Sequence, residues 1–232
     1  MPEVSERTHE DHHRELVSRL AREIKPARRL QSVGMRLALW MLLEVGVLAW
    51  VVTHTDNDFL PKLKQGPAYA IEIVFFVAAA MISAILALRS AIPGRPLRAA
   101  ETILGVTLVL AGIVLITVSA SIRTGYQLQE FLHLGLRCAR ETVVLASTPW
   151  LLLWWLVSRG FPTRGRLSGS LIGAGAMFFS FALMRIVCPI DEPLHLLTWH
   201  LLPAFTLIAF STWAGAVLLR FPRRIPRTEP PG

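Results

Sequence analysis

The sequence is poor in the residues that hold small secreted or soluble domains together. Only two of its 232 residues are cysteines, which excludes the disulfide framework of a small secreted fold. Charged residues make up 17% of the chain, against roughly a quarter in soluble globular domains. The first thirty residues carry many charges and no apolar run, so we expect no cleavable signal peptide. Neither a secreted nor a soluble domain fits this composition.

The signatures of well-known catalytic sites are also missing. The chain contains no HExxH pair, no GxSxG nucleophile turn, no phosphate-binding loop and no dinucleotide fingerprint. A net charge of +8 would suit a nucleic-acid ligand, but the cations fall between apolar segments and do not build one basic face. We therefore expect neither an enzyme nor direct binding of nucleic acid.

Long apolar segments are what the chain has in abundance. Hydrophobic residues make up 53% of it, with a mean hydropathy of +0.49. They come in blocks long enough to cross a hydrocarbon core of roughly 30 Å at about 1.5 Å per residue. We predict an all-α polytopic protein of the lipid bilayer with six transmembrane helices. The predicted spans are 35–53, 67–88, 102–120, 141–158, 168–187 and 198–219.

Lysines and arginines are distributed unevenly between the loops. With six spans, eighteen of the 24 fall on the side of the two termini, five fall on the other side, and Arg185 lies within the fifth span. The positive-inside rule then places both termini in the cytoplasm. The predicted domains are a cytoplasmic segment at 1–32, a transmembrane domain at 33–220 and a cytoplasmic tail at 221–232.

Two local patterns refine this arrangement. Apolar and polar residues occupy opposite helical faces in the long connection at 122–140, which predicts a short helix lying in the outer interface. Gly169 and Gly173 form a GxxxG pair, which allows a neighbouring helix to approach closely.

The segment from about residue 10 to residue 30 predicts an amphipathic helix, because its apolar residues recur at helical spacing. Pro26 should end or kink this helix. Two roles remain open. The basic residues could lie on anionic lipid, or the apolar face could enter a groove of a soluble partner. The apolar face consists of Leu16, Leu20 and Ile24, and the basic residues include Arg28 and Arg29.

The two cysteines lie at equal distances from the turn between the fourth and fifth spans. Cys138 is 25 residues before Thr163, and Cys188 is 25 residues after it. Because a short loop makes the two helices antiparallel neighbours, both thiols should reach one height at the outer rim. They could form a disulfide, bind a soft metal ion with nearby ligands, or only fill space. The candidate additional ligands are His133, Asp191, His195 and His200.

His195 and His200 are five residues apart across a predicted helix start. This spacing does not give the i, i+4 pair of a zinc-binding helix. A single histidine at a membrane rim is more often an interfacial residue that makes hydrogen bonds.

Three charged residues fall inside the predicted spans. They are Glu44, Glu72 and Arg185. Such residues usually pair or line a cavity, and Arg185 is a candidate partner for Glu72 because both lie toward the outer leaflet. A polar contact between helices is one interpretation. The alternative is a small polytopic transporter or a metal-handling membrane protein.

Three stretches of the chain resemble the NrsF-like family of negative regulators of sigma factors. They are LAREIKPARRL at 20–30, FPTR at 161–164, and CPIDEP at 188–193 followed by Trp199 and His200. The resemblance covers nearly the whole chain, although Glu23 stands where the family often has aspartate.

This resemblance implies a six-span anti-sigma factor of the bacterial inner membrane. The N-terminal segment would hold an extracytoplasmic-function sigma factor. The resemblance also implies that two outer cysteines, matching Cys138 and Cys188, take part in sensing heavy-metal or oxidative stress. No cofactor is expected beyond a soft metal ion bound transiently as the signal.

Overall fold

The computed structural model describes residues 14–20, 22, 31–54, 64, 67–92, 98–119, 128–160, 162–188, 190 and 192–219. In these residues the secondary structure is helical, without a β-strand, which confirms the predicted all-α class. The chain divides into two units, Met1–Gln31 and Ser32–Gly232, and each is described by itself.

In the N-terminal unit, residues 14–20 and residue 22 are helical. Leu16 and Leu20 of the predicted apolar face are exposed, as is Val17 beside them. Ile24, Arg28 and Arg29 lie outside the described residues. The predicted helix is therefore present in its described part, with its apolar side chains open.

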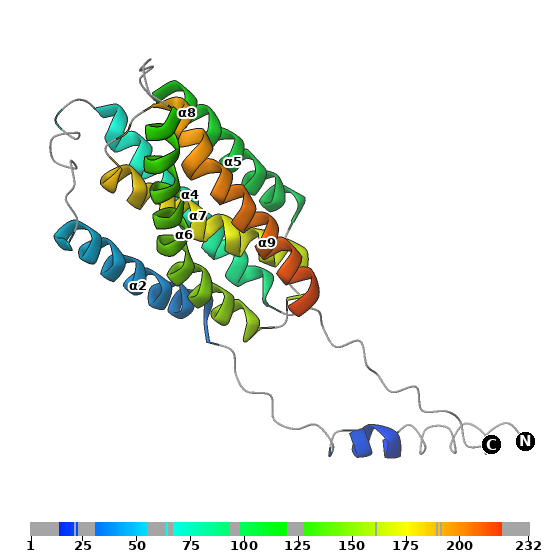
Figure 1. The fold of residues 1–232 in the computed structure, drawn as a ribbon. Coiled ribbons are helices and arrows are strands. Elements are labelled where there is room, and N and C mark those ends of the chain that lie inside the picture. Colours follow the sequence, from blue (N-terminus) through cyan, green and yellow to red (C-terminus); the bar gives the residue numbers. More distant parts are fainter. Residues whose placement is uncertain are drawn as a thin grey trace, which may run out of the picture. The chain divides into compact units, whose positions relative to one another are not determined.

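The second unit is a bundle of helices (Figure 1). Its elements are α2 (Val33–His54), α4 (Pro67–Ser90), α5 (Ala99–Ser119), α6 (Leu128–Ser158), α7 (Gly165–Val187), α8 (Pro193–Leu196), the π-helix η1 (Leu197–Leu201) and α9 (Leu202–Leu218). Among the described residues, five segments are long and apolar enough to cross a membrane, and Ala99–Leu115 of α5 is a shorter apolar helix. Whether α5 completes a set of six spans stays a prediction.

Helix α7 forms the centre of the bundle and packs against α4, α6 and α9. Its side chains are buried almost without interruption from Ser168 to Ile186. The GxxxG pair lies on this helix and contacts α9, where a Cβ on Gly169 would overlap the backbone of Ser211. The hydroxyl of Ser211 donates a 2.6 Å hydrogen bond to the carbonyl of Gly169. The small residues thus bring α7 and α9 close together at the end of α7 that is remote from Cys188.

Helix α6 differs from the prediction. We expected an interfacial helix up to residue 140 and a separate span from 141, but Leu128–Ser158 is one continuous helix of 31 residues. A helix of this length measures about 46 Å, which exceeds a hydrocarbon core of about 30 Å. No proline interrupts residues 128–140, so the helix continues to satisfy its own backbone hydrogen bonds. Of its apolar face, Phe131 packs within the bundle and contacts Trp199 at a ring-centroid distance of 5.5 Å, whereas Leu132 and Leu136 are exposed.

Arg36 of α2 links three helices at the end of the bundle where α4 and α6 end. This side chain is 2% exposed and donates hydrogen bonds to the carbonyls of Leu156 in α6, at 3.2 Å, and Leu88 in α4, at 3.3 Å. These carbonyls lie in the last turns of their helices, where intrahelical partners run out. Sequence reasoning assigned Arg36 only a topological charge and missed this role.

Candidate functional site

Four polar side chains converge where α6 begins, α7 ends and α8 begins. Cys138 comes from α6, Cys188 directly follows α7, His195 lies in α8 and His200 in η1. One candidate ligand atom from each lies within 4.8 Å of the others. All four residues are buried, with exposed fractions of 8% or less. We call these residues the Cys–His cluster.

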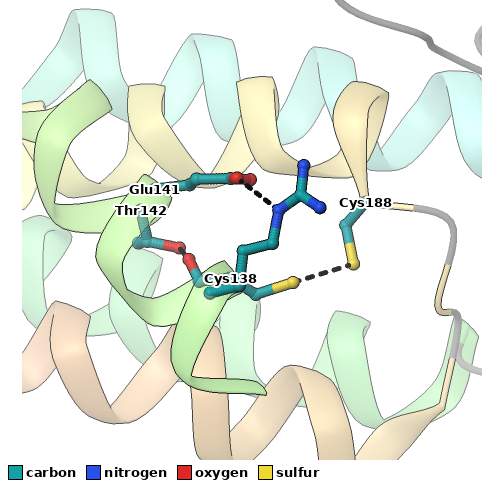
Figure 2. Close-up of polar contacts among 5 residues, drawn as sticks. Cys138, Glu141, Thr142 and Cys188 are labelled. Atoms are coloured by element: carbon teal, nitrogen blue, oxygen red, sulfur yellow. Dashed lines mark hydrogen bonds and ion pairs between the residues drawn. The ribbon is translucent and has the colours of Figure 1, made fainter. Parts of the chain in front are cut away.

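The two thiols face each other across the α6–α7 contact (Figure 2). Their Sγ atoms are 3.8 Å apart and are not joined by a disulfide. The helical hairpin therefore brings the cysteines together, as their equal distances from the turn predicted. The backbone N–H of Cys188 donates to the carbonyl of Met184 at 2.7 Å, which fixes the backbone of Cys188 at the end of α7.

The surroundings of Cys188 favour its thiolate. The hydrogen bond between the thiols of Cys138 and Cys188 has the largest effect on the pKa of Cys188 and lowers it, whereas burial raises it. His195 lowers the pKa further, with its Nε2 3.6 Å from the sulfur of Cys188. The thiolate is the nucleophilic and metal-binding form of cysteine, so the site favours the reactive form of one thiol.

The histidines converge because the helix that carries them widens. An α-helix turns about 100° per residue, so side chains five residues apart point about 140° away from each other. Here η1 follows α8, and the N–H of Leu202 bonds to the carbonyl of Leu197 in the i→i+5 pattern of a π-helix. The two imidazole centroids are 5.3 Å apart. The sequence analysis assumed α-helical spacing and missed this convergence.

Pro203 provides a local reason for the wide turn. A proline inside an α-helix has no N–H to donate, and its ring clashes with the carbonyl four residues earlier. For Pro203 that carbonyl belongs to Trp199, inside η1. A π-turn at this point relieves the clash, and π-turns of this kind occur frequently at functional sites.

Thr142 orients the ring of His200. Its Oγ1 donates a 2.8 Å hydrogen bond to the carbonyl of Cys138 and lies 3.2 Å from Nδ1 of His200. Because the hydroxyl proton is used on the carbonyl, the oxygen accepts a hydrogen bond from the N–H at Nδ1 of His200. This assigns the lone pair of the imidazole to Nε2, which is buried and has no hydrogen-bond partner among the described residues. No sequence pattern pointed to Thr142.

Aromatic side chains enclose the cluster. Phe131 lies at a centroid distance of 6.5 Å from His195, and Phe181 lies 6.0 Å from His200. The indole of Trp199 packs directly on Gly135, where any Cβ would overlap it. The enclosure keeps the surroundings apolar, so a charge in the cluster needs an internal partner.

Glu72 and Arg185 form a buried ion pair at the same end of the bundle. Nε of Arg185 lies 2.9 Å from Oε1 of Glu72, and a second guanidinium nitrogen donates to Oε2 at 3.1 Å. The hydroxyl of Tyr69 donates to the carbonyl of Arg185 at 2.7 Å. The structure thus forms the pair that the sequence suggested.

Among the other predicted residues that the structure describes, none joins the cluster. His133 is exposed and does not belong to the group, and Asp191 lies outside the described residues. Glu44 is 4% exposed, and neither of its carboxylate oxygens has a hydrogen-bond partner in the described part of the chain. The described residues therefore supply no polar contact between helices for Glu44, and that interpretation stays a prediction.

A comparison with known proteins gives one match. The family model described as "Negative regulator of sigma F" matches residues 20–221, which is most of the chain and includes the whole Cys–His cluster. No curated protein and no solved structure matches the chain.

Proposed function

Because the chain belongs to the NrsF family, the negative regulators of sigma F, we propose that it is a membrane-bound anti-sigma factor for a sigma factor of the extracytoplasmic-function type. The family match over residues 20–221 carries this proposal. The apolar helices of the described bundle support a membrane location. The uneven distribution of lysine and arginine supports an inner-membrane orientation with both termini in the cytoplasm and the Cys–His cluster outside.

The N-terminal segment is the proposed binding site for the sigma factor. Leu16 and Leu20 present exposed apolar side chains on a helix, and Ile24, Arg28 and Arg29 continue the segment. An apolar helix face fits a hydrophobic groove of a partner protein. Lipid anchoring by this helix is not needed, since the apolar helices of the second unit already supply an anchor.

Cys138 and Cys188 are the proposed sensors of heavy-metal or oxidative stress. Their sulfur atoms are 3.8 Å apart, whereas a disulfide bond is about 2.05 Å long. Bridging them, or binding a thiophilic cation, would shift the start of α6 relative to the end of α7. Release of the sigma factor then requires that the shifted state bind it less tightly than the resting state.

The binding part is tested by capturing the sigma factor on membranes that contain the full chain or a variant. Burying one leucine is worth about 1.5–3 kcal/mol, so Leu20→Glu should weaken capture at least about tenfold. Ser18→Glu is the matched control, since it adds the same charge on the opposite face of the helix. Equal capture by both variants would refute binding through this face.

The sensing part is tested with Cys138→Ser and Cys188→Ser, singly and together. We expect sigma-dependent transcription, measured with and without cadmium or chromate, to change in each single variant and to change no further in the double variant. Wild-type induction in all three would remove the sensor role from the cysteines.

A further inference from the structure

The geometry points to a tetrahedral metal site in which Cys138, Cys188, His195 and His200 together bind one divalent d¹⁰ cation, with Zn²⁺ as its ordinary occupant. This inference deepens the proposed function, because it names a ligand for the thiol pair and adds two histidines to it. Metal binding itself can be measured without the sigma factor.

The distances within the cluster fit such a site. With Zn–S bonds of about 2.3 Å and Zn–N bonds of about 2.05 Å, tetrahedral angles place two sulfurs about 3.8 Å apart and a sulfur and a nitrogen about 3.6 Å apart. The structure has 3.8 Å between the two Sγ atoms and 3.6 Å between Sγ of Cys188 and Nε2 of His195. All four ligand atoms lie within 4.8 Å of one another, so small side-chain shifts complete the tetrahedron.

His200 is prepared as a ligand by the residue behind it. Metal-binding histidines usually donate their second ring N–H to an oxygen, which fixes the tautomer and the ring orientation. Thr142 supplies that oxygen at 3.2 Å from Nδ1, and Nε2 remains buried without a hydrogen-bond partner among the described residues. An unsatisfied imidazole nitrogen in a dry site costs free energy, which a metal ion at this position would recover.

Charge and ligand type select the kind of metal. Two thiolates balance the charge of a divalent cation, and two neutral imidazoles add none, so the complex is neutral inside its apolar enclosure. Each protonated thiol loses its proton to solvent on binding, and no oxidation state changes. Four sulfur and nitrogen ligands suit Zn²⁺ and Cd²⁺, whereas Mg²⁺ and Ca²⁺ require oxygen.

The site also joins parts of the chain that are far apart in sequence. Its ligands come from α6, the end of α7, α8 and η1. A bound cation would therefore fix α6, the end of α7 and the α8–η1 segment with respect to one another. Loss or exchange of the cation would free them at the place where the proposed function locates the sensor.

Zinc binding is tested on the purified full chain in detergent with a reductant, after removal of metals by a chelator. Equilibrium dialysis against buffered Zn²⁺ followed by elemental analysis should give one zinc per chain. Co²⁺ serves as the spectroscopic probe, because a tetrahedral thiolate site gives strong ligand-field bands together with sulfur-to-metal charge transfer.

Five variants separate the ligands from their surroundings. Loss of an orienting partner costs about 10–100-fold in metal affinity, so Thr142→Val should lose that much and Thr142→Ser should keep wild-type affinity. His195→Gln and His200→Gln should each lose more than Thr142→Val. His133→Gln is the matched control, since this exposed histidine on α6 lies outside the group and its loss should leave the affinity unchanged.

His200→Cys distinguishes the loss of a metal ligand from misfolding of the variant. It supplies a third sulfur, so the cobalt complex should form with increased charge-transfer absorption. Absence of zinc from the wild-type protein would overturn the site. Wild-type zinc affinity in the His195→Gln/His200→Gln double variant would also overturn it, because the metal would then be bound by the thiols alone. Absent zinc with altered transcription in the cysteine variants would reject this site and keep the proposed function. Zinc binding without any effect of the cysteine variants on transcription would keep this site and reject the proposed function.

Discussion

The ion pair between Glu72 and Arg185 gives the most quantitative prediction about stability. Both side chains are almost completely buried, at 1% and 5% exposure, and two short contacts join them. Arg185→Met removes the positive charge that contacts the buried carboxylate of Glu72. Removing one partner of a buried pair costs about 3–5 kcal/mol, because the remaining charge keeps its desolvation penalty. The unfolding equilibrium should therefore shift by roughly two to nearly four orders of magnitude.

The double variant tests the physical reason for this loss. Apolar replacement of an entire buried ion pair is often neutral or stabilising, because both desolvation penalties disappear together. Glu72→Leu combined with Arg185→Met should therefore recover most of the stability that Arg185→Met loses. The hydrogen bond from Tyr69 uses the backbone carbonyl of Arg185, so it survives in every variant.

Unfolding of the full chain by sodium dodecyl sulfate in mixed micelles, followed by circular dichroism, measures these changes. We expect a large loss of stability in Arg185→Met and strong non-additivity in the double-mutant cycle of Glu72 and Arg185. A loss below about 1 kcal/mol for Arg185→Met would show that water or a rearrangement solvates Glu72. A double variant no more stable than the single one would show that the pair supports packing rather than charge balance.

Three further predictions follow from local geometry. Gly215→Ala should destabilise the bundle by about 1–3 kcal/mol, because its Cβ meets the backbone of α7. Gly46→Ala is the matched control: its Cβ meets no other atom within 4 Å, so stability should be unchanged or rise by up to about 1 kcal/mol. Arg36→Met should cost about 1.5–3 kcal/mol in the same unfolding assay, because two buried carbonyls lose a charged donor. Pro203→Ala should lower zinc affinity by roughly tenfold, since it restores α-helical pairing where the histidines converge.

Features that depend on counting along the chain could be predicted from the sequence. The apolar blocks predicted the positions of the long helices, because length and hydropathy decide which segments can cross a membrane. The meeting of Cys138 and Cys188 followed from equal distances on two antiparallel helices. The pairing of Glu72 with Arg185 followed from their similar depth in the bilayer and the high cost of a lone intramembrane charge.

Features that depend on particular atoms in three dimensions could not be predicted. Thr142 and Arg36 act through backbone carbonyls, which every residue carries, so no sequence pattern marks their partners. The boundary expected near residue 141 was wrong because one helix continues through residues 128–158, and Phe131 on its amphipathic part packs against Trp199 of another helix. Periodicity alone identifies a face that needs covering and leaves its partner undetermined.

The Cys–His cluster shows how one departure from ideal helix geometry determines a site. Side chains five residues apart diverge on an α-helix, so regular periodicity argues against His195 and His200 as joint ligands. The proline three residues after His200 changes the result, because the turn before it must give up one hydrogen bond or widen. Widening moves both imidazoles to one side, where the thiols of Cys138 and Cys188 already meet. The informative sequence signal was therefore the combination of a five-residue histidine spacing with Pro203, and neither feature is informative alone.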